Sequence, residues 1–185
     1  MLEIRIHGRG GQGAVTSVEL IALAAIEEGK YAQGFPSFGP ERRGAPVSAF
    51  SRIDDKPIRL RSKIYNPDVV VVLDPSLLGS ANPAGGLKEG GLVIVNSNKT
   101  EDQVRAEFGY KGRLGLVDAS HIAMEEMGVP ITNTTMIGAV IGATSVIKSE
   151  SLDSPIRERF GKIAEKNIRA YKRAMVEIKL YPARS

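Results

Sequence analysis

Apolar residues follow two different spacings along the first 30 residues of the chain. Residues 2–7 alternate apolar and polar side chains, as in a half-buried β-strand. After a glycine-rich run, residues 14–28 are rich in alanine and place Val18, Ile21 and Ala25 on one face of a helix. Gly29 follows at a position where helices commonly end. The start of the chain therefore predicts a strand, a glycine loop and an amphipathic helix.

Further apolar runs predict buried strands that alternate with helices. Residues 69–73 form a continuous, mostly β-branched run, typical of a parallel strand buried on both faces. Other strands are expected at 47–53, 58–60, 91–95 and 115–117, and helices at 76–78, 100–108, 119–127, 134–147 and 154–178. This alternation predicts an α/β fold with three layers, α/β/α, and a mostly parallel sheet. Because no linker or internal repeat interrupts it, we expect a single domain over residues 1–185.

Residues 31–46 depart from both spacings. The segment holds three Gly, three Pro and three aromatic residues, and its charges are Glu41, Arg42 and Arg43. Proline excludes a regular helix or a central strand here. We expect a long loop of the kind that often carries function.

The composition limits which chemistry this chain can perform. It has no Cys, which excludes disulfides, Cys-ligated iron–sulfur clusters and thiol catalysis. Its two histidines, His7 and His121, are too few for a multi-histidine metal centre, so no metal site is expected. His7 ends a strand and is more typical of a structural histidine than of a base. His121, Asp118 and Ser120 are triad residue types, but they crowd into one helix start, and this spacing establishes no triad.

Positive charge is concentrated at the end of the chain. Residues 156–185 contain nine Lys and Arg against three Glu, whereas the whole chain carries a net charge of +4. A basic C-terminal helix at about 154–179 is therefore expected, either as a solvated face or as a surface for an acidic partner or anion. The segment has few aromatic residues and no recognition motif, which argues against nucleic acid.

The sequence shows neither a signal peptide nor a membrane span. Met1 leads directly into a predicted strand, and no apolar run approaches the roughly 18 residues that a membrane helix needs. We therefore expect a cytoplasmic protein without a membrane partner.

The glycine-rich run is the strongest candidate for binding. Gly8, Gly10 and Gly13 match the G-x-G-x-x-G pattern between a strand and a helix, where backbone amides and the helix dipole favour an anion. A dinucleotide site would also need an acid at the end of a second strand, about 20 residues on, and a Walker loop would need Gly-Lys-Ser/Thr. Both features are missing. Another phosphate-bearing ligand or a purely structural turn remain open.

Four segments together resemble a known family. They are GRGGQG at residues 8–13, YAQGFPSFGPERRGAPVSAFSRI at 31–53, NPDVVVVLDP at 66–75 and NTTMIGA at 133–139. In this order they resemble the gamma subunit of pyruvate (2-oxoacid):ferredoxin oxidoreductase, which is domain III of the single-chain enzymes. The resemblance runs from Leu2 to about Lys179. One departure is Ala45, which follows Gly44 where the family usually has a second glycine.

The resemblance implies a subunit of an enzyme that converts a 2-oxoacid, most simply pyruvate, and CoA into acyl-CoA, CO2 and reduced ferredoxin. Alpha, beta and delta subunits would be the partners, and would hold the thiamine diphosphate and iron–sulfur clusters. No catalytic residue is expected in this chain. We expect it to help bind CoA, whose phosphates would meet a set of ten residues. These are Gly8, Arg9, Gly10, Gly11, Gln12, Gly13, Arg42, Arg43, Asn133 and Thr134.

Two other interpretations remain open. The chain could be a purely structural or assembly subunit, in which Glu41, Arg42 and Arg43 pair with a neighbouring subunit and Asn133 simply caps a helix. It could instead be an independent nucleotide-dependent enzyme, which the missing acid and Walker features disfavour. The gamma parts of 2-oxoglutarate, branched-chain and indolepyruvate enzymes are similar, so the resemblance leaves the 2-oxoacid open.

Overall fold

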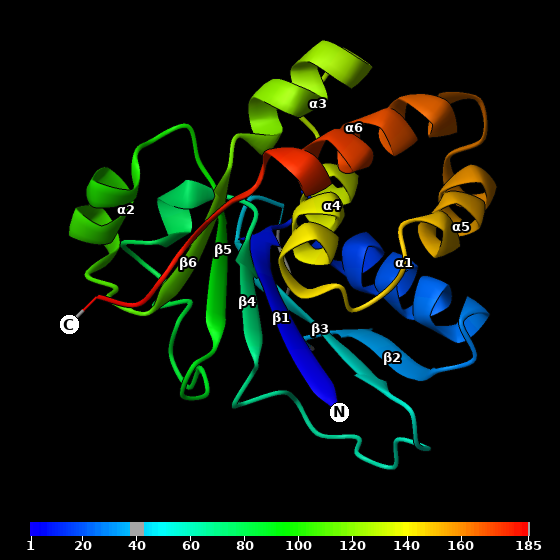
Figure 1. Cartoon of the computed structure of the whole chain (residues 1–185), viewed down its shortest axis with the longest axis horizontal. Helices are drawn as coiled ribbons and strands as arrows, with labels where there is room; N and C mark the ends of the chain where they lie inside the picture. The colour runs from blue at the N-terminus through cyan, green and yellow to red at the C-terminus, as the bar shows by residue number, and fades with distance from the viewer. Residues whose placement is uncertain (38–42, 185) are drawn as a thin grey trace.

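The computed structural model describes residues 1–37 and 43–184, which form a seven-stranded sheet flanked by helices (Figure 1). The strand order is β2-β3-β1-β4-β5-β6-β7. The centre, β1-β4-β5-β6, is parallel, and antiparallel strands extend it at both ends. The strands are β1 (Leu2–Arg9), β2 (Tyr31–Pro36), β3 (Pro46–Asp54), β4 (Val69–Val72), β5 (Leu92–Asn96), β6 (Arg113–Val117) and β7 (Lys179–Tyr181). The sheet is therefore mixed, with a parallel centre, and the predicted α/β class is confirmed.

Helices cover both faces of the sheet, but unequally. Figure 1 shows α1, α3, α4, α5 and α6 over one face, whereas α2 and the short η1 lie on the other. The α-helices are α1 (Ala14–Glu27), α2 (Glu101–Phe108), α3 (Ala119–Met127), α4 (Asn133–Thr144), α5 (Glu150–Phe160) and α6 (Ala164–Glu177). Two 3₁₀ turns, η1 (Pro75–Leu77) and η2 (Gly161–Ile163), complete the described elements.

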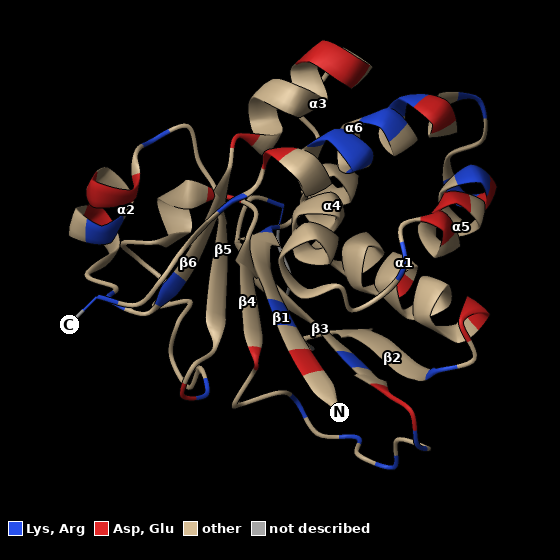
Figure 2. Cartoon of the chain, in the orientation of Figure 1, with Lys and Arg blue, Asp and Glu red and all other residues tan. Residues whose placement is uncertain are grey.

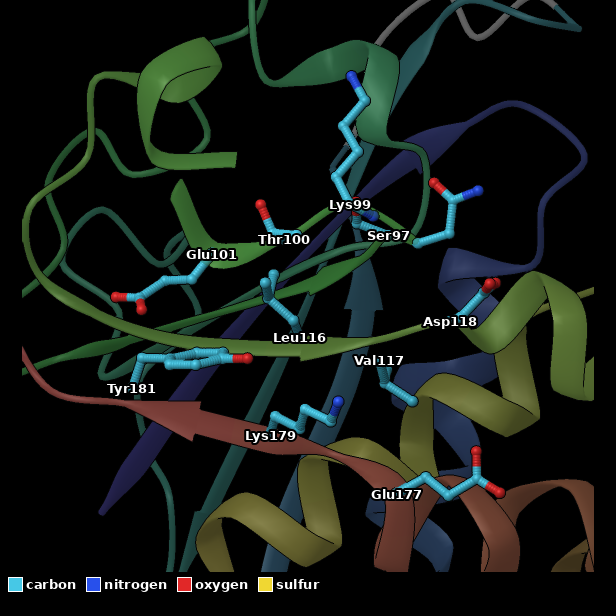
Figure 3. Close-up of a pocket in the computed structure, with 11 residues that line it drawn as sticks. Ser97, Lys99, Thr100, Glu101, Leu116, Val117, Asp118, Glu177, Lys179 and Tyr181 are labelled. Atoms are coloured by element: carbon cyan, nitrogen blue, oxygen red, sulfur yellow. The ribbon is translucent and has the colours of Figure 1, made fainter. Parts of the chain in front are cut away.

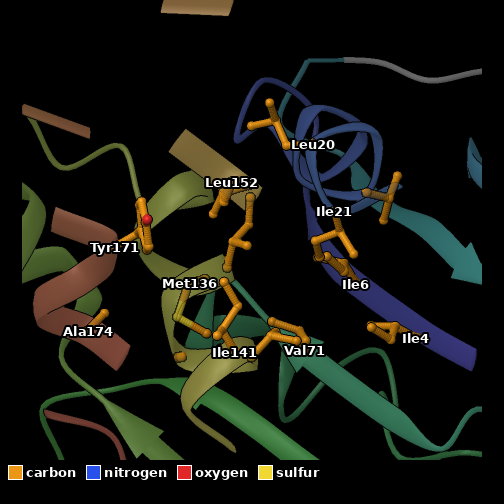
Figure 4. Close-up of a cluster of buried hydrophobic side chains, with 14 of the residues drawn as sticks. Ile4, Ile6, Leu20, Ile21, Val71, Met136, Ile141, Leu152, Tyr171 and Ala174 are labelled. Carbon is orange, nitrogen blue, oxygen red and sulfur yellow. The ribbon is translucent and has the colours of Figure 1, made fainter. Parts of the chain in front are cut away.

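The four valines of β4 show why both faces of the sheet are covered by helices, because successive side chains in a strand point to opposite faces. Val69 and Val71 pack in the larger core cluster, with α1, α4 and α6, whereas Val70 and Val72 pack in the smaller one, with α2. Figure 4 shows the larger cluster, in which Val71 lies among side chains from β1, α1 and α4. A continuous apolar strand is thus buried on both sides, as its sequence predicts.

The C-terminal region differs from the single basic helix predicted at about 154–179. Gly161 adopts a φ of 51°, which separates α5 from α6. Helix α6 packs on α4, where Tyr171 and Ala174 are buried, so only part of this helix is a solvated face. The chain then returns to the sheet as β7, which pairs with β6; the helical pattern of this region does not predict such a strand.

Two further predictions were wrong in the first third of the chain. Residues 31–36, expected as part of a long loop, form strand β2 at the edge of the sheet, a position where Pro36 is tolerated. Gly34 lets α1 approach this strand, since a Cβ there would lie 2.5 Å from the carbonyl oxygen of Val18. In contrast, the short strand expected at residues 58–60 is not formed.

Candidate functional site

A pocket of about 290 Å³ opens where β1, β4 and β5 end and where α1, α3 and α4 begin. Ligands of open α/β sheets commonly bind at this carboxyl edge of the parallel strands. The pocket is lined by Gly11, Gln12, Leu73, Asp74, Pro75, Asn96, Ser120, Pro130, Ile131 and Thr132. The glycine loop, residues 8–13, therefore forms one wall of a cavity.

Asp74, which directly follows β4 and Leu73, holds the glycine loop in place. Its Oδ2 accepts a hydrogen bond from Gln12 Nε2 at 2.9 Å and lies 3.3 Å from Arg9 Nε. Gln12 in turn accepts a bond from the Arg9 amide at 2.7 Å. Burial would raise the pKa of Asp74, but hydrogen bonds from Ser76 and Gln12, together with the charge of Arg9, hold that pKa below its usual value. The loop is thus fixed by an ionised carboxylate.

Residues 43–45 lie directly beside the glycine loop. The Gly10 amide donates to the Ala45 carbonyl at 2.9 Å, and the Gly44 amide donates to the Gly10 carbonyl at 3.2 Å. Arg9 Nη1 also donates to the Gly44 carbonyl at 3.2 Å. Arg43 is exposed next to this contact. Arg42 and Glu41 lie outside the described residues.

Asn133, the first residue of α4, packs against the end of the loop. Gly13 has a φ of 81°, and a Cβ there would lie 2.6 Å from Asn133 Nδ2, so only glycine fits. Asn133 is 6% exposed, and its buried Oδ1 has no hydrogen-bond partner among the described residues. Ser17 Oγ lies 3.4 Å from the Asn133 carbonyl oxygen and links α1 to α4.

Thr134, also predicted for the site, faces the interior instead. Its side chain is fully buried, and its Oγ1 donates to Asn167 Oδ1 at 2.7 Å. Asn167 Nδ2 then donates to the Ile163 carbonyl. The Thr134 hydroxyl therefore joins α4 to α6, and this residue can offer the site only its main chain.

Asn96 and Ser120 line the pocket but were not among the predicted site residues. Asn96 Nδ2 donates to the Leu73 carbonyl at 3.0 Å and to Ser120 Oγ at 2.9 Å, while the Ser120 amide donates back to Asn96 Oδ1 at 3.2 Å. Asn96 and Asp74 share one sequence signal, because each is a polar residue at the end of a buried strand. Asp74 is also followed by Pro75, a pair that is typical of a turn.

The two histidines lie in different environments. His7 Nδ1 is 3.3 Å from Ser48 Oγ, and burial, aided by the charge of Arg5, lowers the pKa of His7 to about 4. His121 is exposed and lies 3.4 Å from Glu125, while Asp118 accepts a bond from the His121 main-chain amide. The side chains of His121, Asp118 and Ser120, all described, thus form no triad.

A second pocket, of about 360 Å³, lies further along the same edge, between the start of α2 and strands β6 and β7 (Figure 3). Several charged residues that line this pocket already form ion pairs with neighbouring side chains. Lys99 pairs with Glu107 at 2.6 Å, and Glu101 pairs with Arg105 at 2.7 Å. Thr100 caps α2 through a reciprocal bond with Gln103. Lys99 and Glu101 are therefore already paired within this chain.

The described residues contain no group of three or more His, Cys, Asp or Glu side chains placed to hold a metal ion. Within the residues that the structure describes, no helix is both long and apolar enough to cross a bilayer.

The sequence is similar to a defined protein family and to named relatives. The family model described as pyruvate ferredoxin/flavodoxin oxidoreductase matches residues 3–177. A protein of Thermococcus kodakarensis named pyruvate/ketoisovalerate oxidoreductases common subunit gamma is 56% identical over 183 residues, which cover 98% of this chain and 99% of that protein.

Solved structures extend this similarity to the fold. The crystal structure of pyruvate oxidoreductase subunit PORC from Thermotoga maritima superposes with a TM-score of 0.87 at 40% identity, covering 97% of each chain. A 2-oxoglutarate:ferredoxin oxidoreductase from Magnetococcus marinus, solved with 2-oxoglutarate, coenzyme A and succinyl-CoA bound, superposes with a TM-score of 0.75 at 20% identity. That match covers 95% of this chain and 30% of the longer one, and at this identity it establishes a shared fold.

Proposed function

Because the chain belongs to the pyruvate ferredoxin/flavodoxin oxidoreductase family, we propose that it works as the gamma subunit of a 2-oxoacid:ferredoxin oxidoreductase. Alpha, beta and delta subunits would be its partners and would carry thiamine diphosphate and the iron–sulfur clusters. The complex would convert a 2-oxoacid and CoA into acyl-CoA and CO2 and pass the electrons to ferredoxin. The gamma relative named as common to pyruvate and ketoisovalerate oxidoreductases supports substrate choice by the other subunits.

Within this complex, we propose that the chain binds the phosphates of CoA at the glycine loop. The observation that carries the proposal is the open face of this loop. Gly11 has a φ of 94°, and a Cβ there would meet no atom within 4 Å. Main-chain amides at such a loop and at the start of the following helix are typical phosphate donors. The enzyme from Magnetococcus marinus, which shares this fold over 30% of its length, was solved with coenzyme A bound.

The side chains around the loop would divide two tasks. Gln12 and Asp74 fix the loop through hydrogen bonds, so its amides keep one direction without reorganisation on binding. Arg43 is exposed and free to reach a phosphate, whereas Arg9 is already partly neutralised by Asp74. Asn133, with its unpartnered buried Oδ1, would supply a neutral contact beside Gly13. None of these groups needs to transfer a proton, so their task is to bind and orient CoA.

A purely structural or assembly role is the second candidate. Arg9, Gln12 and Asp74 satisfy one another, as a loop with only a structural task would require. In this case the loop would serve to bring residues 43–45 to the surface for contact with another subunit.

A CoA titration of the assembled complex separates the two roles. We expect the Arg42→Ala/Arg43→Ala variant to raise the KM for CoA about tenfold, as the loss of charged phosphate contacts predicts, and to leave the KM for the 2-oxoacid unchanged. Lys162→Ala/Lys166→Ala, which removes two exposed cations elsewhere, is the matched control. An unchanged KM for CoA in a fully assembled complex would favour the assembly role.

A further inference from the structure

A basic segment, residues 56–65, follows the edge of the sheet opposite the glycine loop. It connects the end of β3 to the start of β4 and passes the N-terminus in Figure 1. Its sequence, KPIRLRSKIY, contains Lys56, Arg59, Arg61 and Lys63 and no acid. Figure 2 shows these cations following the acidic residues at the end of β3.

The basic segment is fixed to the sheet although it forms no strand. Side chains from three neighbouring strands donate to its carbonyl groups, from Arg5 to Tyr65, from Gln33 to Ile58 and from Arg52 to Lys63, each at 3.4 Å. Ile64 is only 2% exposed and anchors the segment in the protein. Arg52 itself is buried, pairs with Glu3 at 2.9 Å and lies over the ring of Phe35. The position of the segment is therefore built into the fold.

The four cations of the basic segment are exposed and unpaired. Within residues 1–37 and 43–184, none of them makes an ion pair or a side-chain hydrogen bond. The basic tail, residues 156–185, differs, because five of its nine cations pair with acids. The pairs are Arg157–Glu165, Arg169–Glu126, Lys172–Asp153, Arg173–Glu125 and Arg184–Asp102. The tail supplies much of the basic excess, yet the basic segment holds a compact group of free cations.

Exposed apolar side chains accompany this charge. Tyr65 is 70% exposed and Leu60 is 47% exposed, both within the basic segment. Tyr31 opposes Asp54 in the β2–β3 register and is exposed at the same edge, as is Met1, whose amine pairs with Asp54. Arginine and tyrosine are enriched at protein interfaces, where the aromatic ring adds contact area to the charge.

We propose that the basic segment docks on an acidic surface of another subunit of the complex. Four cations on a fixed backbone fit a group of carboxylates, and Leu60 and Tyr65 fit an apolar contact between them. Tyr65 is the one aromatic residue among the aliphatic side chains of the segment, and a single ring is a poor stacking platform for a nucleic-acid strand, so a polypeptide is favoured. This proposal rests on the gamma-subunit role, and it assigns an interface at the edge of the sheet remote from the CoA site.

Zero-length carbodiimide crosslinking of the native complex tests this contact without a substitution. The reagent joins a lysine amine directly to a carboxylate, so we expect Lys56 or Lys63 to be linked to an Asp or Glu of another subunit. Crosslinks elsewhere in the complex but none from these two lysines, or links only to a second copy of this chain, would overturn the proposal. If the chain purifies without other subunits, the gamma-subunit role itself fails, and the two failures are thus distinguishable.

A charge-reversal variant tests how much the cations of the basic segment contribute to binding of the other subunits. We expect Arg59→Glu/Arg61→Glu to weaken binding of this chain to the remaining subunits about tenfold at low salt, because like charges then meet across the contact. Lys162→Glu/Lys166→Glu makes the same charge change on exposed residues elsewhere and should leave binding unchanged. If both variants lose the same affinity for the remaining subunits, or if nuclease abolishes the difference between them, a specific acidic protein partner is contradicted. Circular dichroism spectra verify that each variant folds.

Discussion

Single residues at strand ends decide how the glycine loop is held. Asp74 uses Oδ1 to accept from the Ser76 amide and Oδ2 to accept from Gln12 Nε2. The first contact is local and follows from the sequence, because Asp before Pro commonly begins a turn. The second joins residues 62 positions apart, and no local pattern reveals it. For this reason the loop could be predicted from its glycines, whereas its support could not.

His7 should make stability depend on pH. Its pKa is about 4 in the folded protein and near 6.5 when unfolded, so between these values the unfolded chain binds more protons. The free energy of unfolding should therefore fall as the pH decreases from 6.5 to 4, by at most about 1.4 kcal/mol per pH unit from this group. His7→Gln should flatten this part of the curve, measured by urea unfolding at pH 7 and 5. Equal slopes for both proteins would disprove this linkage.

At the scale of elements, the apolar spacing predicts the central strands and most helices, but it does not predict the break between α5 and α6 or the edge strands β2 and β7. The β-branched run of β4 and the capped start of α2 were predictable because their signals are local. Gly161 ends α5 inside a stretch with a continuous helical pattern, and that pattern does not show the break. Strand β7 has only three residues and exists because β6 offers an open edge, a tertiary cause that local sequence does not carry.

The packing of α4 against α6 gives a prediction at this scale. A Cβ at Gly138 would overlap the Tyr171 carbonyl oxygen, so the two helices must separate to admit it. We expect Gly138→Ala to lower the free energy of unfolding by about 3 kcal/mol, as overpacking does in a tight core. Gly79→Ala is the matched control, because its Cβ would meet nothing within 4 Å, and it should change stability by less than about 0.5 kcal/mol. If urea unfolding shows that both variants lose a similar free energy of unfolding, the close contact between α4 and α6 is contradicted.

At the scale of the whole molecule, strand register brings together two of the segments that carry the family resemblance, residues 8–13 and residues 43–45 of the segment 31–53. Antiparallel pairing places Arg9 opposite Pro46, so the glycine loop and residues 43–45 meet at one edge of the sheet. The resemblance predicted that both segments serve the site, and the register supplies their contact. The same pairing carries the other end of β3 to the opposite edge, where the basic segment begins. The sequence shows the cations of this segment, but only the fold shows that all four lack an acidic partner among the described residues, whereas five of the nine cations in residues 156–185 are paired.

We propose that this chain presents its glycine loop to the phosphates of CoA. Hydrogen exchange of the native complex, measured by mass spectrometry with and without CoA, tests this role because amides that bind phosphate exchange more slowly. We predict slower exchange in peptides covering residues 9–16 when CoA is added, and no change in peptides covering the basic segment. CoA-dependent protection confined to other subunits, with residues 9–16 unchanged, would contradict the claim.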